Sequence, residues 1–356
     1  MQEIDRVLTF WRAAHSAGRR CALGTVVAVE GHSYRKPGAR MLVTDDGQSV
    51  GSVSGGCVER AVAQRAQRVL RTGKPEVLVY DGRHRLGCEG ALHILIEPFA
   101  PANPDALFDA YAKTRGPDLR GAFTLAVAAR MPGERAPRGD LPAERMGTVF
   151  TFAGTGFPAR AGLADVEGLP AEHMWRERIR SAPRLFAVGA ERDAVALAHL
   201  AAGQGWGATL VTHPRNPLEA MDGVRVVPCD PPELLEVVSP DERTAVVLMS
   251  HNYARDLAYL RSLTGAGQLG YLGLLGPGHR RDQLIGDLVE AEPLLPPWFD
   301  ERVYGPAGID LGGELPEQVA LSIVAEVAAV FAGRPVPHLR DKPGSVHAPA
   351  VEPARA

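Results

Sequence analysis

From residue 184 onward, short apolar segments alternate with segments of helical period. The apolar segments are RLFAVGA (184–190), GATLVTH (207–213), GVRVVPCD (223–230), RTAVVLMSH (243–251) and LGYLGLLG (269–276). Amphipathic segments fit between them, and a final helix is expected to begin at Pro316 and run to Phe331. Apolar strands that alternate with amphipathic helices form a parallel sheet covered on both faces. The pattern therefore predicts a Rossmann-like, doubly wound α/β domain.

The first hundred residues carry a different pattern, in which strand-like segments surround one helix. The strand-like segments are CALGTVVAVEG (21–31), ARMLVTDDG (39–47), EVLVYDG (76–82) and ALHILIEPF (91–99). A helix follows Cys57, with apolar side chains at helical spacing from Val58 to Val69, and an amphipathic helix precedes the first strand. This mixture predicts a small α+β domain at the N-terminus.

The segment from 101 to 180 is less regular, with two candidate strands, RGAFTLAVAARM (120–131) and RMGTVFTFAG (145–154). It includes PGERAPRGDLPAE (132–144), a Pro-, Gly- and Arg-rich stretch typical of an exposed loop. We therefore expect a cysteine-containing N-terminal domain with a loop-rich extension over residues 1–180, and the α/β domain over residues 181–335. The tail from 336 to 356 is rich in Pro and Ala and has almost no large apolar residues, so we expect it to be disordered.

Composition limits the classes of function and of partner. A net charge of −3 over 356 residues gives no general affinity for nucleic acid. No apolar run approaches the roughly 20 residues of a membrane span, so we expect no membrane partner. The four cysteines include no Cys-x-x-Cys pair, and the N-terminus is mixed with charge from its start, unlike a signal peptide. We therefore expect reduced thiols and a cytoplasmic protein.

Cys57 lies directly after two glycines and directly before a helix. Gly55 and Gly56 permit a tight turn with positive φ and leave space around the thiol. The N-terminus of a helix carries about half a positive charge, which stabilises a thiolate. This arrangement suits a reactive thiol or a ligand for a soft metal, whereas the alternative is a cysteine buried as a small apolar residue. Glu59 either complements the helix terminus or handles a proton, and we favour the first role.

A second cysteine has a similar setting. Cys88 lies in LGCEG, between two predicted strands. Cys57 and Cys88 are the two candidate metal ligands. The nearby segment GHSYRKPGARM is basic, and Arg40 within it would suit an anionic ligand, although a solvated surface loop gives the same pattern. Cys21 and Cys229 lack a glycine context and are expected in the core.

The α/β domain carries an altered dinucleotide fingerprint. Gly189 follows the first strand, but Glu191 takes the place of the second glycine, where its bulk and negative charge oppose a pyrophosphate. Thr212 stands where a carboxylate would bind the ribose, so NAD(P) binding is poorly supported. Further candidates follow the later strands: His251, Gly276 and Arg280. A glycine turn that enters a helix beside arginine suits an anion, and helix capping with solvated arginines is the alternative.

Several of these segments resemble the XdhC/CoxI family. GHSYRKPGARMLV, GSVSGGCVE and LGCEGALHILIEP are similar to its N-terminal domain. Four further segments are similar, in the same order along the chain, to its C-terminal Rossmann domain: LFAVGAERDAVALAHLAAGQGWGATLV, SHNYARDLAYLRSL, GYLGLLGPGHRR and YGPAGIDLGGELPEQVALSIVAEVAA. The resemblance covers nearly the whole chain except the loop at 131–145 and the tail.

The resemblance implies a maturation factor for molybdenum hydroxylases such as xanthine dehydrogenase. Family members bind molybdenum cofactor, protect it while its terminal sulfur is installed and help to insert it into the hydroxylase. The expected cofactor-binding residues are Cys57, Cys88, Gly55, Gly56, Glu59, Arg40, Gly189, His251, Gly276 and Arg280, with no catalytic residue. The expected partners are the hydroxylase client, a cysteine desulfurase and a second copy of the chain.

The chain departs from the family pattern at Glu89, Glu191 and Thr212, which leaves the cofactor contacts of the second domain open. An NAD(P)-dependent oxidoreductase with a thiol-lined substrate or metal site is the main alternative. A small-ligand sensor with inert thiols is a third. Pterin retained by the purified protein would favour the maturation factor. Hydride transfer from NADPH would favour the oxidoreductase, and unreactive thiols would favour the sensor.

Overall fold

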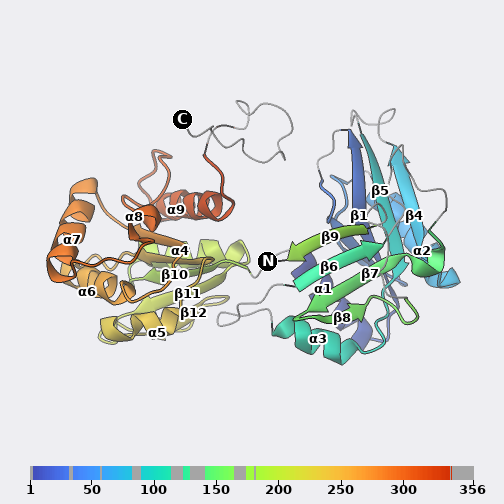
Figure 1. The fold of residues 1–356 in the computed structure, drawn as a ribbon, viewed down its shortest axis with the longest axis horizontal. Coiled ribbons are helices and arrows are strands. Elements are labelled where there is room, and N and C mark those ends of the chain that lie inside the picture. The colour runs from blue at the N-terminus through green and yellow to red at the C-terminus, as the bar shows by residue number, and fades with distance from the viewer. Residues whose placement is uncertain are drawn as a thin grey trace. The chain divides into compact units, whose positions relative to one another are not determined.

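The structure is a computed structural model. It describes residues 3–31, 35–56, 58–81, 90–113, 123–128, 141–163, 174–179, 182–336 and 338. These residues form two compact units, the first ending in the chain at residue 181 and the second beginning at 182 (Figure 1). Nearly all of the tail that the sequence predicts to be disordered lies outside the described residues.

The first unit is built on a five-stranded sheet in the order β3-β2-β1-β5-β4, in which all neighbours are antiparallel. Its strands are β1 (Cys21–Gly31), β2 (Arg40–Thr44), β3 (Ser49–Gly51), β4 (Glu76–Asp81) and β5 (Gly90–Pro98). Helix α2 (Glu59–Thr72) buries Val62 and Ala66 against one face of this sheet. Helix α1 (Glu3–Ser16) packs on the other face through its apolar stripe, as its spacing predicts.

The extension that the sequence predicts to be loop-rich contains a second antiparallel sheet, in the order β8-β7-β6-β9. Its elements are α3 (Pro104–Ala112), β6 (Phe123–Ala128), the short 3₁₀ helix η1 (Ala143–Arg145), β7 (Gly147–Phe152), β8 (Thr155–Pro158) and β9 (Met174–Ile179). Leu95 of β5 shares a buried cluster with Val127 of β6 and Leu163. Strand β5 is therefore covered on both faces, which explains its nearly continuous apolar sequence. The first unit is α+β, as predicted.

The second unit is a six-stranded parallel sheet in the order β12-β11-β10-β13-β14-β15. Its strands are β10 (Arg184–Val188), β11 (Gly207–Thr212), β12 (Arg225–Pro228), β13 (Thr244–Leu248), β14 (Tyr271–Leu274) and β15 (Val303–Tyr304). Its helices are α4 (Arg192–Gly203), η3 (Pro231–Glu233), α5 (Leu234–Val238), α6 (Tyr253–Leu263), α7 (Gly278–Ala291), α8 (Phe299–Arg302) and α9 (Pro316–Phe331). Because strand order 3-2-1-4-5-6 is that of a Rossmann fold, the predicted fold class is confirmed.

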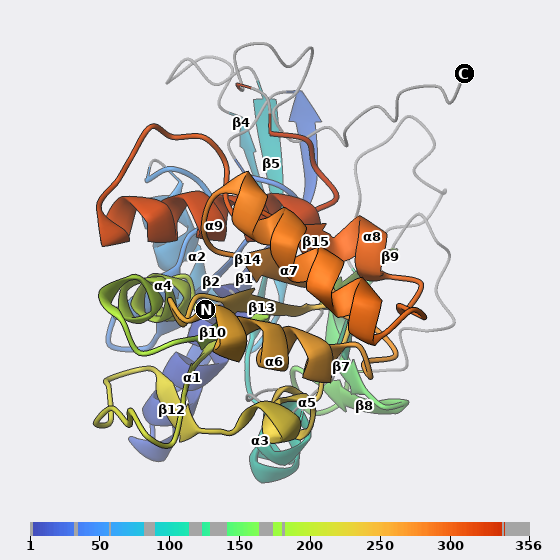
Figure 2. The same cartoon turned by 90° about the vertical axis from the view of Figure 1, so that its left-hand side faces the viewer.

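Alternate residues of β10 face two separate cores. Leu185 and Ala187 pack with α4 and α9, whereas Phe186 and Val188 pack with α6 and α7. Figure 2 looks onto α6 and α7, which lie side by side. The strand order reverses between β10 and β13, and a ligand crevice is expected outside the carboxyl ends of these two strands. In the described part of the chain, no helix is long and apolar enough to cross a bilayer.

Candidate functional site

The loop that precedes α2 is folded around the carboxylate of Glu59. The Ser52 hydroxyl and the Ser54 N–H donate to Glu59 Oε1 at 2.6 and 2.8 Å. The Ser54 hydroxyl donates to Oε2 at 2.7 Å, and the Val58 N–H reaches the same oxygen at 3.2 Å. Because all four donors belong to one loop, the carboxylate fixes the path by which the chain enters the helix.

These hydrogen bonds also determine the charge of Glu59. Partial burial alone would raise its pKa, but the donors from Ser52 and Ser54 outweigh burial and lower the pKa to about 2. Glu59 is therefore a charged acceptor at the N-terminus of α2. Its negative charge lies close in the chain to Cys57, where it opposes the stabilisation that a helix N-terminus gives to a thiolate.

Gly55 and Gly56 form the exposed tip of this loop. Gly56 has a φ of 123°, a backbone conformation that other residues rarely adopt, so this position favours glycine. Cys57 and Cys88 lie outside the described residues, and the thiol and metal site stays a prediction. Among the residues that are described, no group of three or more His, Cys, Asp and Glu side chains could hold a metal ion.

Arg40 lies on β2 and only 2% of its surface is exposed. Its Nη2 pairs with Glu177 Oε2 of β9 at 2.7 Å, and its Nη1 donates to the Gly38 carbonyl at 2.8 Å. The guanidinium also lies over the Trp175 ring, 5.6 Å from its centroid. Arg40 thus links the two sheets of the first unit, and an anionic ligand would have to displace Glu177 to reach it.

In the second unit, the turn after β10 differs from a dinucleotide-binding turn. A Cβ at Gly189 would lie 2.6 Å from the Met249 carbonyl oxygen, so the close approach of β13 requires glycine here. Glu191 is the N-cap residue of α4 and is exposed, and it also lines a cavity of about 630 Å³ bounded by α4 and α9. Thr212 is buried at the end of β11. The N-terminus of α4 therefore carries a carboxylate where a pyrophosphate would need space and positive potential.

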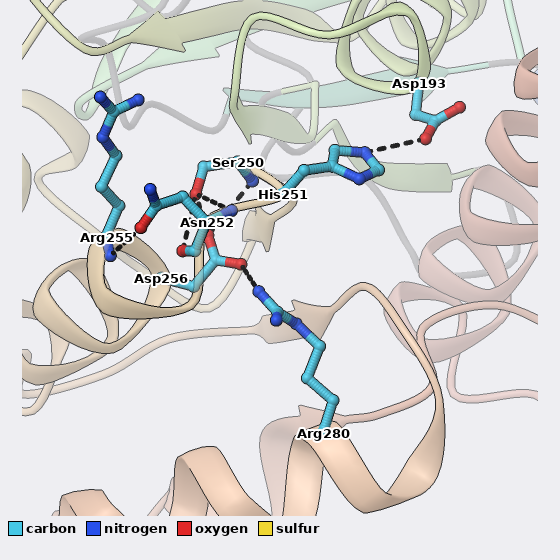
Figure 3. Close-up of polar contacts among 7 residues, drawn as sticks. All are labelled: Asp193, Ser250, His251, Asn252, Arg255, Asp256 and Arg280. Carbon is cyan, nitrogen blue, oxygen red and sulfur yellow. Dashed lines mark hydrogen bonds and ion pairs between the residues drawn. The ribbon is translucent and has the colours of Figure 1, made fainter.

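His251 follows β13, and its side chain points toward Asp193 of α4 (Figure 3). Its Nε2 lies 3.0 Å from Oδ2 of Asp193, which is in the first turn of α4. About half of the His251 side chain is exposed, and its φ of 53° is a left-handed conformation unusual for histidine. The His251–Asp193 pair thus joins the carboxyl ends of β10 and β13, the two strands that flank the crevice.

Arg280, in the first turn of α7, is directed toward α6. Its Nη2 donates to Oδ2 of the buried Asp256 at 2.8 Å. A Cβ at Gly276, where φ is 111°, would lie 2.7 Å from Arg280 Cδ, so the arginine packs against a bend that favours glycine. The positive charge of Arg280, which the sequence suggests for an anionic ligand, is matched by a carboxylate of the protein itself.

The structure brings the predicted residues together in two groups, one in each unit. The loop group contains Gly55, Gly56 and Glu59, and the crevice group, which follows the carboxyl ends of β10, β13 and β14, contains Gly189, His251, Gly276 and Arg280. Arg40 is paired with Glu177 of β9 instead. Sequence reasoning missed Ser54, Asp193 and Asp256. Both aspartates lie in the first turn of a helix, where an acid is ordinarily explained by the helix dipole, so neither gives a signal of a site.

Two protein-family models match the chain. The XdhC and CoxI family matches residues 14–81, and the XdhC Rossmann domain matches residues 185–327. One match therefore includes the loop before α2, and the other includes the crevice group.

Two relatives match along most of their length. A Bacillus subtilis (strain 168) protein, named as a probable subunit of xanthine dehydrogenase, is 29% identical over 326 residues, which are 86% of this chain and 91% of the relative. The Escherichia coli (strain K12) molybdenum cofactor insertion chaperone PaoD is 27% identical over 335 residues, 91% of this chain and 87% of the relative. A crystal structure from Bacillus halodurans, described as a xanthine dehydrogenase, has the same fold, with a TM-score of 0.72 at 22% identity over 94% of this chain and 98% of that one.

Proposed function

The chain belongs to the XdhC and CoxI family, and from this membership we propose that it is an accessory protein that carries molybdenum cofactor to a molybdenum hydroxylase. The cofactor is cargo in this proposal, and the chain has no turnover of its own. The name of the Escherichia coli relative, an insertion chaperone for this cofactor, supports the proposal. The name of the Bacillus subtilis relative supports xanthine dehydrogenase, or a similar hydroxylase, as the client.

The loop before α2 is the observation that carries the proposal. Its Gly55–Gly56 tip is exposed, and four hydrogen bonds to the ionised Glu59 fix the chain on either side of Cys57. Molybdenum favours soft thiolate ligands and sulfur transfer uses thiolates, so a cysteine that follows this exposed glycine pair in the chain suits the cargo. We propose that Cys57, together with Cys88, contacts the metal end of the cofactor.

Further parts of the proposal concern partners and place. We propose that the cofactor receives its terminal sulfur while bound, with a cysteine desulfurase as the donor, and that two copies of the chain act together in the cytoplasm. We also propose that the second unit, taken by itself, binds a pterin rather than NAD(P). The carboxylate of Glu191 at the N-terminus of α4 supports this choice, since it opposes a pyrophosphate at that place.

Anaerobic purification followed by metal and pterin analysis tests the proposal. We expect molybdenum and pterin to copurify with the chain, and both to be absent when the chain is made in a host that cannot synthesise the cofactor. Addition of the loaded protein to a cofactor-free hydroxylase should restore its activity. Purified protein that lacks pterin but transfers hydride from NADPH would contradict the proposal and favour an oxidoreductase.

A further inference from the structure

Asp256 lies beneath the crevice and organises the loop that follows β13 (Figure 3). It is in the first turn of α6 and only 2% of its surface is exposed. Its Oδ1 accepts the Ser250 hydroxyl at 2.6 Å and the Ser250 N–H at 3.1 Å. Its Oδ2 accepts Nη2 of Arg280 at 2.8 Å. One buried carboxylate therefore ties together the end of β13, helix α6 and helix α7.

Arg280 is held in this position from two sides. Its guanidinium lies over the Tyr253 ring, 5.5 Å from the centroid, and its aliphatic part packs against the bend at Gly276. A buried carboxylate is stable only when it is paired and hydrogen-bonded, and Asp256 meets both conditions through Arg280 and Ser250. We name Asp256, Arg280 and Ser250 the brace.

The brace acts on His251 through the backbone. Ser250 is fixed by Asp256, and on the other side Oδ1 of Asn252 caps α6 by accepting the Arg255 N–H at 3.0 Å. His251 lies between these two anchors in a left-handed conformation, which persists only where the surrounding contacts hold it. Asp256 is buried, whereas the imidazole is half exposed, so a buried carboxylate helps to hold an exposed side chain in a strained position.

The pairing of His251 also determines which hydrogen bonds it offers. The carboxylate of Asp193 accepts a hydrogen bond from Nε2, which assigns the proton of a neutral imidazole to that nitrogen. The other nitrogen, Nδ1, is then an acceptor. A neutral His251 therefore offers Nδ1 to an N–H or O–H donor of a ligand, such as the amino-pyrimidine edge of a pterin.

We propose that Asp256 is a positioning residue of the crevice: supported by Arg280, it holds His251 so that Nδ1 accepts a hydrogen bond from the pterin ring of the cargo. This proposal rests on the proposed function, because it takes the cargo from it. It assigns the contact to His251, and it assigns to Arg280 a role in support of Asp256 rather than a direct contact with an anion.

A double-mutant cycle tests the proposal, with purified molybdopterin as the probe and the full chain as the protein. Asp256→Asn and His251→Gln should each weaken molybdopterin binding about tenfold, the scale of one hydrogen bond in a charged network. If Asp256 acts through His251, the double variant should bind no more weakly than His251→Gln alone. Ser250→Ala, which removes a single hydrogen bond from the brace, provides a milder variant in case Asp256→Asn does not fold.

The matched control is the pair formed by Arg261 and Glu292, 2.9 Å apart, which also joins α6 to the end of α7 but is exposed. Arg261→Gln should change binding less than twofold, because an exposed pair contributes little. A second readout follows His251 itself: in histidine-labelled protein, its ring resonances should move in Asp256→Asn and Ser250→Ala and stay in place in Arg261→Gln.

The outcomes separate the positioning role from the choice of cargo. Losses that add in the double variant, or His251 resonances that do not move in the brace variants, would overturn the positioning role. Failure of the wild-type chain to bind molybdopterin would overturn the proposed function and the pterin contact, whereas the resonances of His251 would still decide whether the brace positions it.

Discussion

At the scale of single residues, the structure describes two of the four cysteines, Cys21 and Cys229. Cys21 and Cys229 are buried, with 3% and 0% of their surfaces exposed. Burial, reinforced by nearby acidic side chains, raises the pKa of each thiol to about 11. Neither thiol therefore forms a thiolate readily at neutral pH, in agreement with their expected place in the core. Cys57 follows an exposed glycine pair, so substitution of serine should have opposite consequences at Cys57 and at Cys21.

Cys57→Ser should retain folding and lose cargo. Serine is close to cysteine in size, and position 57 precedes Val58, the N-cap residue of α2, so thermal melting should change little. It replaces a soft sulfur ligand by a hard, protonated oxygen, so we expect loss of most of the molybdenum and pterin and failure to activate the hydroxylase. Cys21→Ser buries a hydroxyl in the core beneath α1, which should cost about 1 to 3 kcal/mol while cargo content is retained.

The comparison requires melting, pterin content and client activation for both variants side by side. Full cargo and full activation with Cys57→Ser would remove the chemical basis of the proposed thiol contact. Equal loss of cargo from both variants would indicate that cargo depends on general stability and not on a particular thiol.

At the scale of elements, a buried carboxyl group joins the two sheets of the first unit. Glu97 of β5 has no exposed surface, and it accepts the Thr148 hydroxyl at 2.5 Å and the Thr148 N–H at 3.1 Å. A Cβ at Gly147 would lie 2.9 Å from Glu97 Oε2, so the glycine permits this approach of β7. Burial raises the pKa of Glu97 to about 7, although the bonds from Thr148 and the charge of Arg160 act in the opposite direction.

This carboxyl group should make the stability of the first unit depend on pH. Its folded-state pKa lies above its ordinary value of 4.5, so its contribution is fully present below about pH 4.5 and is lost as the pH rises through about 7. Glu97→Gln resembles the protonated form and should abolish this decline. At about pH 8 the variant should exceed the wild type by up to about 3 kcal/mol, measured by urea unfolding over this pH range.

Glu76→Gln provides the control for this prediction. Glu76 lies on β4 of the same sheet, and a hydrogen bond from Arg68 holds the pKa of its carboxyl below the usual range. Its contribution is therefore lost only in acid, as the pH falls through that lowered pKa. If the free energy of unfolding of Glu97→Gln still declines above pH 4.5, the pH dependence belongs to another titratable group.

The success of sequence-based prediction differed between elements for physical reasons. Helix α9 begins at Pro316 and ends at Phe331 as expected, since its helical period and its first-turn proline are both visible in the sequence. Strand β9 reads MWRERI and buries only Ile179, so it has no apolar alternation by which it could be recognised. Strands β6 and β7 lie within the two candidate strands of this region, 120–131 and 145–154, whereas β9 was missed because its sequence has no such pattern.

The candidate site shows the same division. Glycines at a bend or a close approach, such as Gly56 and Gly276, are visible from sequence because few other residues fit there. Pairings between distant segments are not visible: Asp256 and Arg280 are 24 residues apart and meet only because α6 and α7 pack together. Sequence therefore indicated Arg280 as a candidate but not that its charge is matched within the protein.

At the scale of the whole molecule, the apolar cores divide as the two units do. Among the described residues, three buried clusters lie within the first unit and two within the second. Cooperative unfolding follows shared cores, so separate cores predict separate transitions. Variants confined to one core then identify which transition belongs to which unit.

Calorimetry of the full chain should therefore show two transitions that respond to different substitutions. At about pH 8, Glu97→Gln should raise the Tm of one transition by roughly 5 to 10 °C, because a gain of 1 kcal/mol shifts a unit of this size by about 2 to 4 °C. Asp256→Asn leaves Arg280 without its buried partner and should lower the Tm of the other transition only. A variant with both substitutions should show both Tm shifts undiminished, because the effects of substitutions at distant, independent sites add. One transition that both substitutions move would instead mean that the two units unfold as a single cooperative body.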